Sequence, residues 1–119
     1  MIPDNILLAT DFSETASLLI ETLPDLKRVG ARRVTLFHAM DVRKTKEGLM
    51  NLKTHFQEKL EDEKKKIVEK GFEVETVLTR GYPEEKIVER ARQDDSLILI
   101  ASHGKGYIKK YFWAVLLMM

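Results

Sequence analysis

The chain has 119 residues, carries 20 lysines and arginines against 19 aspartates and glutamates, and contains no cysteine. Its length is that of one domain able to bury a core, and the lack of cysteine excludes disulfides, thiolate metal sites and a cysteine nucleophile. The net charge of +1 gives no long-range attraction to nucleic acid or to an anionic membrane, so we expect no nucleic-acid partner, and other partners must be argued from local sites.

The N-terminal part of the chain predicts a strand, a helix and a second strand. Residues 6–9 and 34–39 are continuous apolar runs, typical of parallel strands that are covered on both faces. Between them, Ser13 is placed to cap a helix that extends to Gly30. Pro24 removes one backbone hydrogen bond within this helix and is expected to kink or divide it. The N-terminus has no basic segment or cleavage signal, which predicts a cytoplasmic protein.

The middle of the chain predicts a long amphipathic helix over residues 46–70, ended by Gly71. Its apolar stripe consists of Leu49, Leu52, Phe56, Leu60 and Ile67. We interpret the charge-rich stretch 58–66 as the solvated face of this helix and not as a nucleic-acid patch.

The last predicted elements are a strand, a helix and a strand. Residues 74–78 and 97–101 are apolar, and Pro83 with Glu84 and Glu85 is typical of a helix N-terminus. Strands therefore alternate with helices, which predicts an α/β fold with an open, mostly parallel, twisted sheet and helices on both faces.

Ligands of such folds bind beyond the carboxyl ends of the strands, where the strand order reverses. Residues 9–13, 38–41 and 101–106 should converge there. The sequence Ser-His-Gly-Lys-Gly within the last segment has backbone amides that could hold a phosphate.

Other sites are not supported by the sequence. Gly104 and Lys105 do not form a P-loop, since Leu99 stands where the first glycine belongs, and the third glycine of a dinucleotide fingerprint is missing. His38, His55 and His103 are scattered over a strand end, a helix and a loop, so we expect no metal site from them and interpret His38 as a packing residue.

Four segments, ILLATDFSETA, VTLFHAMDV, GYPEEKIVERA and LILIASHGKG, resemble in order and spacing a universal stress protein domain of the UspA type. The resemblance covers residues 1–106 of a single domain over 1–119, and residues 107–119 form a divergent apolar tail. It implies a Rossmann-like fold, a cytoplasmic role in the stress response and self-association as a homodimer.

The ATP-binding branch of that family implies a set of pocket residues. Ala9 would line the pocket, Asp11 would lie near the ribose or near a magnesium ion held by the phosphates, and the backbone near Ala39 would recognise adenine. The phosphate loop would consist of Ala101, Gly104 and Lys105. The resemblance implies no catalytic residue and at most slow ATP hydrolysis.

The phosphate loop departs from the family pattern at two places. Ala101 replaces its first glycine, and Ala114 and Val115 replace a glycine followed by serine or threonine. Valine has no hydroxyl, and losing one charge-assisted hydrogen bond costs about 1.5–3 kcal/mol. We therefore expect a weakened adenine-nucleotide pocket, with a non-nucleotide-binding interaction or dimerisation protein of the same fold as the alternative.

The family normally continues with a further helix and a fifth strand. Here Met119 ends the chain, so we expect a shortened domain whose strand 97–101 is an open edge. Three interpretations of the apolar tail follow: a stub of the missing helix, a self-association surface, or a membrane-surface anchor too short to span a bilayer.

Overall fold

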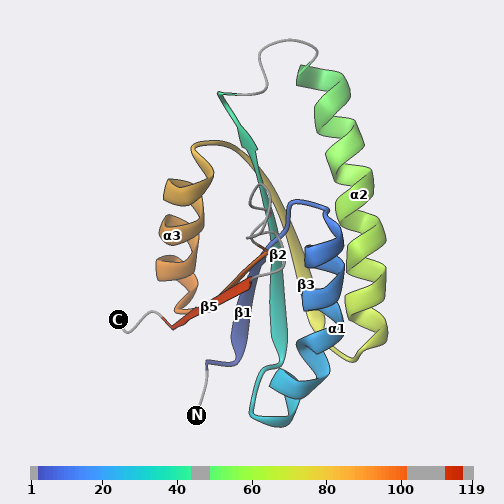
Figure 1. The fold of residues 1–119 in the computed structure, drawn as a ribbon, viewed down its shortest axis with the longest axis vertical. Coiled ribbons are helices and arrows are strands. Elements are labelled where there is room, and N and C mark those ends of the chain that lie inside the picture. Colours follow the sequence, from blue (N-terminus) through green and yellow to red (C-terminus); the bar gives the residue numbers. More distant parts are fainter. Residues whose placement is uncertain (1–2, 44–48, 102–111, 117–119) are drawn as a thin grey trace.

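The computed structural model describes residues 3–43, 49–101 and 112–116, which alternate strands and helices as predicted (Figure 1). The strands are β1 (Asn5–Ala9), β2 (Arg33–Asp41), β3 (Glu73–Gly81), β4 (Leu97–Ala101) and β5 (Phe112–Leu116). The helices are α1 (Glu14–Arg28), α2 (Leu49–Glu69) and α3 (Pro83–Asp94). None of these helices is both long and apolar enough to cross a membrane.

The strands form one sheet with the order β3-β2-β1-β4-β5. The first four strands are parallel, with Ala9 of β1 opposite Phe37 of β2 on one side and Ile100 of β4 on the other. The chain thus moves outward from β1 to β3 and then returns to the other side of β1. The switch point, where ligands bind in such folds, lies between β1 and β4.

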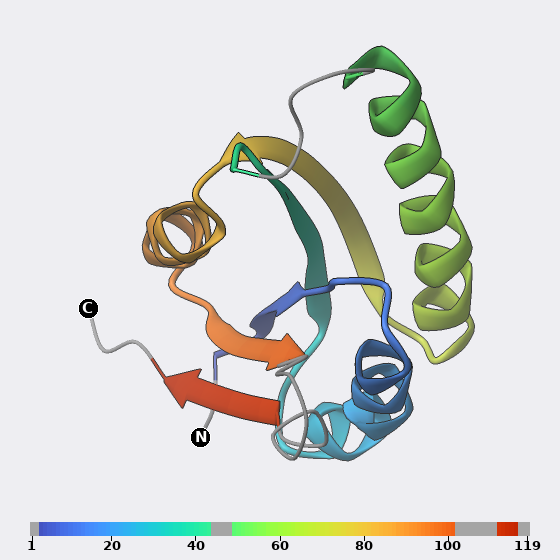
Figure 2. The ribbon, with the colours of Figure 1, turned by 45° about the horizontal axis from the view of Figure 1, so that its top comes forward.

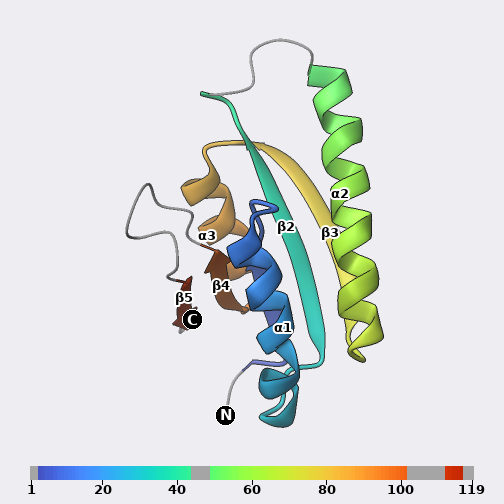
Figure 3. The same cartoon turned by 45° about the vertical axis from the view of Figure 1, so that its right-hand side comes forward.

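Helices cover both faces of the sheet, as predicted (Figure 3). α1 and α2 pack on the face of Ile6, Leu8 and Leu36, while α3 packs on the opposite face, with Ala91 against Leu7. Successive strand residues are buried on both sides, which explains why these strands are continuously apolar.

α1 confirms the predicted cap and end but not a division at Pro24. The Ser13 hydroxyl accepts a hydrogen bond from the Ala16 amide, and Gly30, with φ 124°, follows the last turn in a left-handed conformation that suits glycine. The helix runs through Pro24 without interruption, because buried Leu23 before it and Leu26 after it pack against the same core while Pro24 itself is exposed.

α2 confirms most of the predicted stripe and corrects one part of the interpretation. Leu60 and Ile67 are buried in the core. The charge-rich stretch 58–66 is not uniformly solvated, since Glu63 is only 8% exposed. Glu63 lies between Leu60 and Ile67 at helical spacing and therefore shares their buried face.

β5 corrects the expectation of an open edge at β4 and of a tail that forms a helical stub. Residues 112–116 form a strand that runs antiparallel to β4, with Trp113 opposite Ile100 and Val115 opposite Ile98 (Figure 2). Aromatic and β-branched residues favour strands, and the unpaired amides of an edge strand attract one. Only residues 102–111 separate the two strands, too few for the crossover that a parallel partner usually needs.

Candidate functional site

A cavity of about 340 Å³ opens at the carboxyl ends of β1 and β2, beside the switch point. This volume lies at the lower end of the range of about 300–1,000 Å³ that small-molecule sites occupy. Its lining comes from five elements and the loop between β1 and α1: Ala9, Thr10, Asp11, Phe37, His38, Ala39, Met40, Asp41, Phe56, Pro83, Ile87 and Ile100. Most of this surface is apolar, and carboxylates lie where β1 and β2 end.

The loop from β1 to α1 is held by Thr10. The Thr10 amide donates to the Phe37 carbonyl at 2.9 Å, and the Thr10 hydroxyl oxygen accepts from the Phe12 amide at 3.0 Å. Phe12 has φ 63°, a left-handed conformation that is strained for a bulky residue. Such a conformation persists only where the surrounding contacts enforce it. This turn leaves Asp11 exposed at the pocket, with one carboxylate oxygen accepting from the Ser13 amide at 2.9 Å.

His38 of β2 packs against this loop. Its Nδ1 lies 2.7 Å from the Thr10 carbonyl oxygen, and its ring lies 4.6 Å from the rings of both Phe12 and Phe56, measured between centroids. Burial lowers the pKa of His38 below 6.5, an effect that the bond to Thr10 opposes. The imidazole is therefore neutral at physiological pH and packs as an aromatic ring, which confirms its interpretation as a packing residue.

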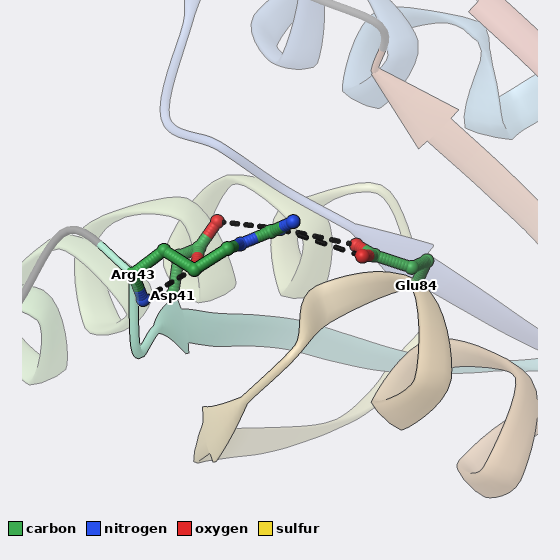
Figure 4. Close-up of polar contacts among 3 residues, drawn as sticks. All are labelled: Asp41, Arg43 and Glu84. Carbon is green, nitrogen blue, oxygen red and sulfur yellow. Dashed lines mark hydrogen bonds and ion pairs between the residues drawn. The ribbon is translucent and has the colours of Figure 1, made fainter.

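A cluster of charged side chains lies where β2 ends near the start of α3 (Figure 4). Arg43 donates to both carboxylate oxygens of Asp41 at 2.8 Å and lies 3.4 Å from Glu84. Its guanidinium also lies 5.2 Å from the centre of the Tyr82 ring. Arg43, which lies beside the pocket residue Asp41, is thus already paired with carboxylates.

A second cavity, of about 350 Å³, lies at the opposite, amino ends of β1, β2 and β3. Arg33, Glu73, Glu75 and Asp94 supply its charged walls. Ligands of parallel α/β sheets bind at the carboxyl ends, so the cavity near Asp11 is the better candidate.

The structure brings together three of the six predicted pocket residues: Ala9, Asp11 and Ala39. Ala101 ends β4, directly after Ile100 of the pocket wall, and Gly104 and Lys105 lie outside the described residues. Across residues 3–43, 49–101 and 112–116, no group of three or more histidine, aspartate or glutamate side chains could hold a metal ion, so Asp11 has no such partners there.

The positions expected to clamp a phosphate lie in β5. Ala114 is opposite Leu99 and Val115 is opposite Ile98, both in the interior of β4. Their backbone is therefore paired along the sheet, away from the carboxyl end of β4.

Sequence reasoning missed Phe56 as a wall of the pocket and Arg43 as the partner of the pocket residue Asp41. Phe56 was expected only as a member of the apolar stripe of its helix. Phe56 is far from the strand ends along the chain, so the sequence does not indicate that the start of α2 lies near those ends. Arg43, two residues after Asp41, carries a weak signal, because a carboxylate followed so closely by an arginine often forms a local ion pair.

Comparison with known proteins identifies the family. The family model of the universal stress protein family matches residues 3–114. The chain belongs to the universal stress protein family. Within this family it is 30% identical, over an alignment of 129 residues, to the universal stress protein MJ0577 of Methanocaldococcus jannaschii, covering 88% of this chain and 80% of that protein.

Solved structures agree with this family assignment. A structure of the hypothetical protein MJ0577 superposes with a TM-score of 0.79 at 33% identity, over 93% of this chain and 83% of that one. The universal stress protein UspA from Lactobacillus plantarum superposes with a TM-score of 0.71 at 15% identity, over 90% and 83% of the two chains, and supports the fold alone.

Proposed function

We propose that this universal stress protein is a cytoplasmic, non-enzymatic module of the stress response that binds an adenine nucleotide weakly in the cavity at the ends of β1 and β2. The observation that carries the proposal is the convergence of Ala9, Asp11 and Ala39 around one apolar cavity. These three residues come from two neighbouring strand ends and the loop between β1 and α1.

The lining fits the nucleoside half of such a ligand. Ile87, Ile100 and Ala39 offer apolar surface to a purine ring, and the exposed carboxylate of Asp11 can accept a hydrogen bond from a ribose hydroxyl. A base in this position would lie against the end of β2, whose backbone supplies donors and acceptors.

The phosphate half has less support among the described residues. Asp11 and Asp41 place negative charge at the pocket, and Arg43 is already paired with Asp41. A triphosphate would therefore need a divalent cation to offset this repulsion, with Asp11 as the carboxylate placed to approach it. Val115 has no hydroxyl and lies within β5, so we expect no contact to phosphate like that of the serine or threonine in the ATP-binding branch.

We propose no catalytic step at this site beyond slow hydrolysis at most. His38 is the imidazole of the pocket lining, and its Nδ1 already donates to the backbone of Thr10. A general base must reach the proton that it removes, and the half-buried His38 ring packs against Phe12 and Phe56 instead.

A second candidate function is self-association without a nucleotide, as a homodimer. β5 is the last strand of the sheet, and among the described strands it pairs with β4 alone. An edge strand of this kind exposes amides and carbonyls that can pair with another chain.

Calorimetric titration with Mg-ATP and with adenosine, together with thermal melts, tests the proposal. We expect 1 mM Mg-ATP to raise the Tm by no more than about 2 °C, and adenosine to bind within about fivefold of Mg-ATP because the phosphates add little. A shift of many degrees below 1 mM Mg-ATP would show an intact phosphate clamp. Absence of binding by both ligands would favour self-association as the function, which sedimentation velocity measures directly.

A further inference from the structure

The pairing between β1 and β2 stops at the pocket, one backbone bond before its regular pattern would continue. Ala9 is the last residue of β1 in this register and lies opposite Phe37 of β2. The Thr10 amide then donates to the Phe37 carbonyl at 2.9 Å. In a regular parallel ladder the next bond would run from the Ala39 amide to the Thr10 carbonyl and would pair Thr10 with His38. The register of the two strands ends before that pair.

The side chain of His38 takes the place of that backbone bond. Its Nδ1 atom lies 2.7 Å from the Thr10 carbonyl oxygen, and because a carbonyl oxygen only accepts, Nδ1 is the donor. Two other rings hold the imidazole: the centroid distances are 4.6 Å from His38 to Phe12 and to Phe56, and 5.7 Å between Phe12 and Phe56. The Thr10 carbonyl is therefore bonded to a ring that is packed in place, and not to the backbone of β2.

This change of donor matters for the backbone of Ala39. The backbone groups of alternate residues in a strand face the same neighbouring strand, so the Ala39 amide faces the side of β1, as the Phe37 carbonyl does. At the level of Ala39 the pairing with β1 has ended, and Ala39 lines the cavity. A ligand in the cavity that carries a hydrogen-bond acceptor, such as a ring nitrogen of a purine, suits this amide.

We propose that His38 is a positioning residue of the pocket, which ends the ladder between β1 and β2 at the Thr10 carbonyl and thereby leaves the Ala39 amide to the ligand. This inference rests on the proposed function for its effect on binding, but its effect on the backbone of β2 is independent of any ligand. Without the donor on His38, the Ala39 amide is the next group placed to bond the Thr10 carbonyl. The ladder would then extend by one bond, and a ligand would have to displace it.

The test is His38→Phe, which keeps an aromatic ring against Phe12 and Phe56 but removes the donor. We expect hydrogen exchange of the Ala39 amide to slow about three- to tenfold, because this amide gains a bond to the Thr10 carbonyl. We expect binding of adenosine to weaken by a similar factor, because the ligand must break that bond. Loss of stability speeds exchange, so slower exchange at Ala39 distinguishes positioning from a structural role.

Two further variants serve as controls. His38→Asn loses the ring but keeps an amide donor for the Thr10 carbonyl, so Ala39 exchange and adenosine affinity should stay within about twofold of the wild type. Val34→Ala removes buried side-chain volume near the amino end of the same strand and should lower the free energy of unfolding. It should neither slow exchange at Ala39 nor change adenosine affinity by more than about twofold.

Unchanged or faster Ala39 exchange in His38→Phe would overturn the inference whether or not a nucleotide binds. Normal affinity in His38→Phe with weak binding in His38→Asn would also overturn it, because the ring and not the donor would then govern the site. If the wild type binds no adenosine, the proposed function fails, and the exchange measurement still decides whether His38 ends the ladder.

Discussion

The Nδ1 atom of His38 lies 2.7 Å from the carbonyl oxygen of Thr10, so the end of β2 is bonded to the loop that follows β1. A carbonyl oxygen can only accept, which requires a proton on Nδ1 and leaves Nε2 unprotonated in the neutral ring. The same ring packs against Phe12 and Phe56. One neutral histidine thus connects both strand ends that form the pocket.

The stability of the protein should depend on pH through His38. Because its folded-state pKa is lowered by burial, the unfolded chain binds the proton more readily, so this stabilisation is present above pH 6.5 and is lost as the pH falls below it. His38→Asn keeps a donor for the Thr10 carbonyl but does not titrate. Urea unfolding should show the wild type losing stability relative to this variant between pH 7.5 and pH 5.5. A constant difference across that range would contradict the account.

The cap of α1 should contribute measurably to stability. Ser13→Ala removes the hydroxyl that accepts from the Ala16 amide at 3.2 Å and should lower the free energy of unfolding by about 1 kcal/mol. Ser17→Ala, at an exposed position within the same helix, should change it by less than about 0.5 kcal/mol. Equal effects in urea unfolding would show that the bond at Ser13 is not a stabilising cap.

The charge of Asp11 should matter more for Mg-ATP than for adenosine. Asp11→Asn keeps an oxygen that can accept from the Ser13 amide and from a ribose hydroxyl, so the fold and adenosine binding should be little affected. Removal of the carboxylate should weaken Mg-ATP binding by up to about fivefold in calorimetric titrations, which brings it to the affinity of adenosine. Equal losses for the two ligands would show that Asp11 does not act through a cation.

The ion pairs of Arg43 should contribute little to stability. Arg43 and Glu84 are both exposed, and although the Asp41 side chain is only 14% exposed, its partner Arg43 lies in solvent, so both ion pairs are screened by solvent and salt. Arg43→Gln should change the Tm by less than about 2 °C in thermal melts at 0.15 M salt. A larger loss would mean that this contact holds α3 against the end of β2.

The order of the parallel strands and the helices could be predicted from the sequence because each element carries its own local signal. Residues 6–9 and 97–101 are continuously apolar, Ser13 and Gly30 bound α1, and Pro83 begins α3. Such signals depend on burial and backbone geometry within a few residues. For the same reason, Ala9, Asp11 and Ala39 could be placed at one site from topology alone.

The contacts between distant elements could not be predicted in this way. β5 forms because the apolar tail pairs with the edge strand β4, and strand propensity alone does not predict that pairing. Likewise, Glu63 in the middle of α2 is only 8% exposed although it is charged. A signal for the burial of Glu63 did exist, since it continues the spacing of Leu60 and Ile67, but its charge favoured the interpretation of a solvated face.

The central claim is that the nucleotide binds in the cavity at the ends of β1 and β2. The most direct test is an NMR titration of the isotope-labelled wild type with Mg-ATP, in which the backbone amide resonances are monitored. The account predicts shifts that saturate together at Ala9, Asp11 and Ala39, with no change at Glu73 or Glu75 of the cavity at the amino ends of the strands. Shifts confined to that second cavity, or no shifts at Ala9, Asp11 and Ala39 at millimolar Mg-ATP, would contradict it.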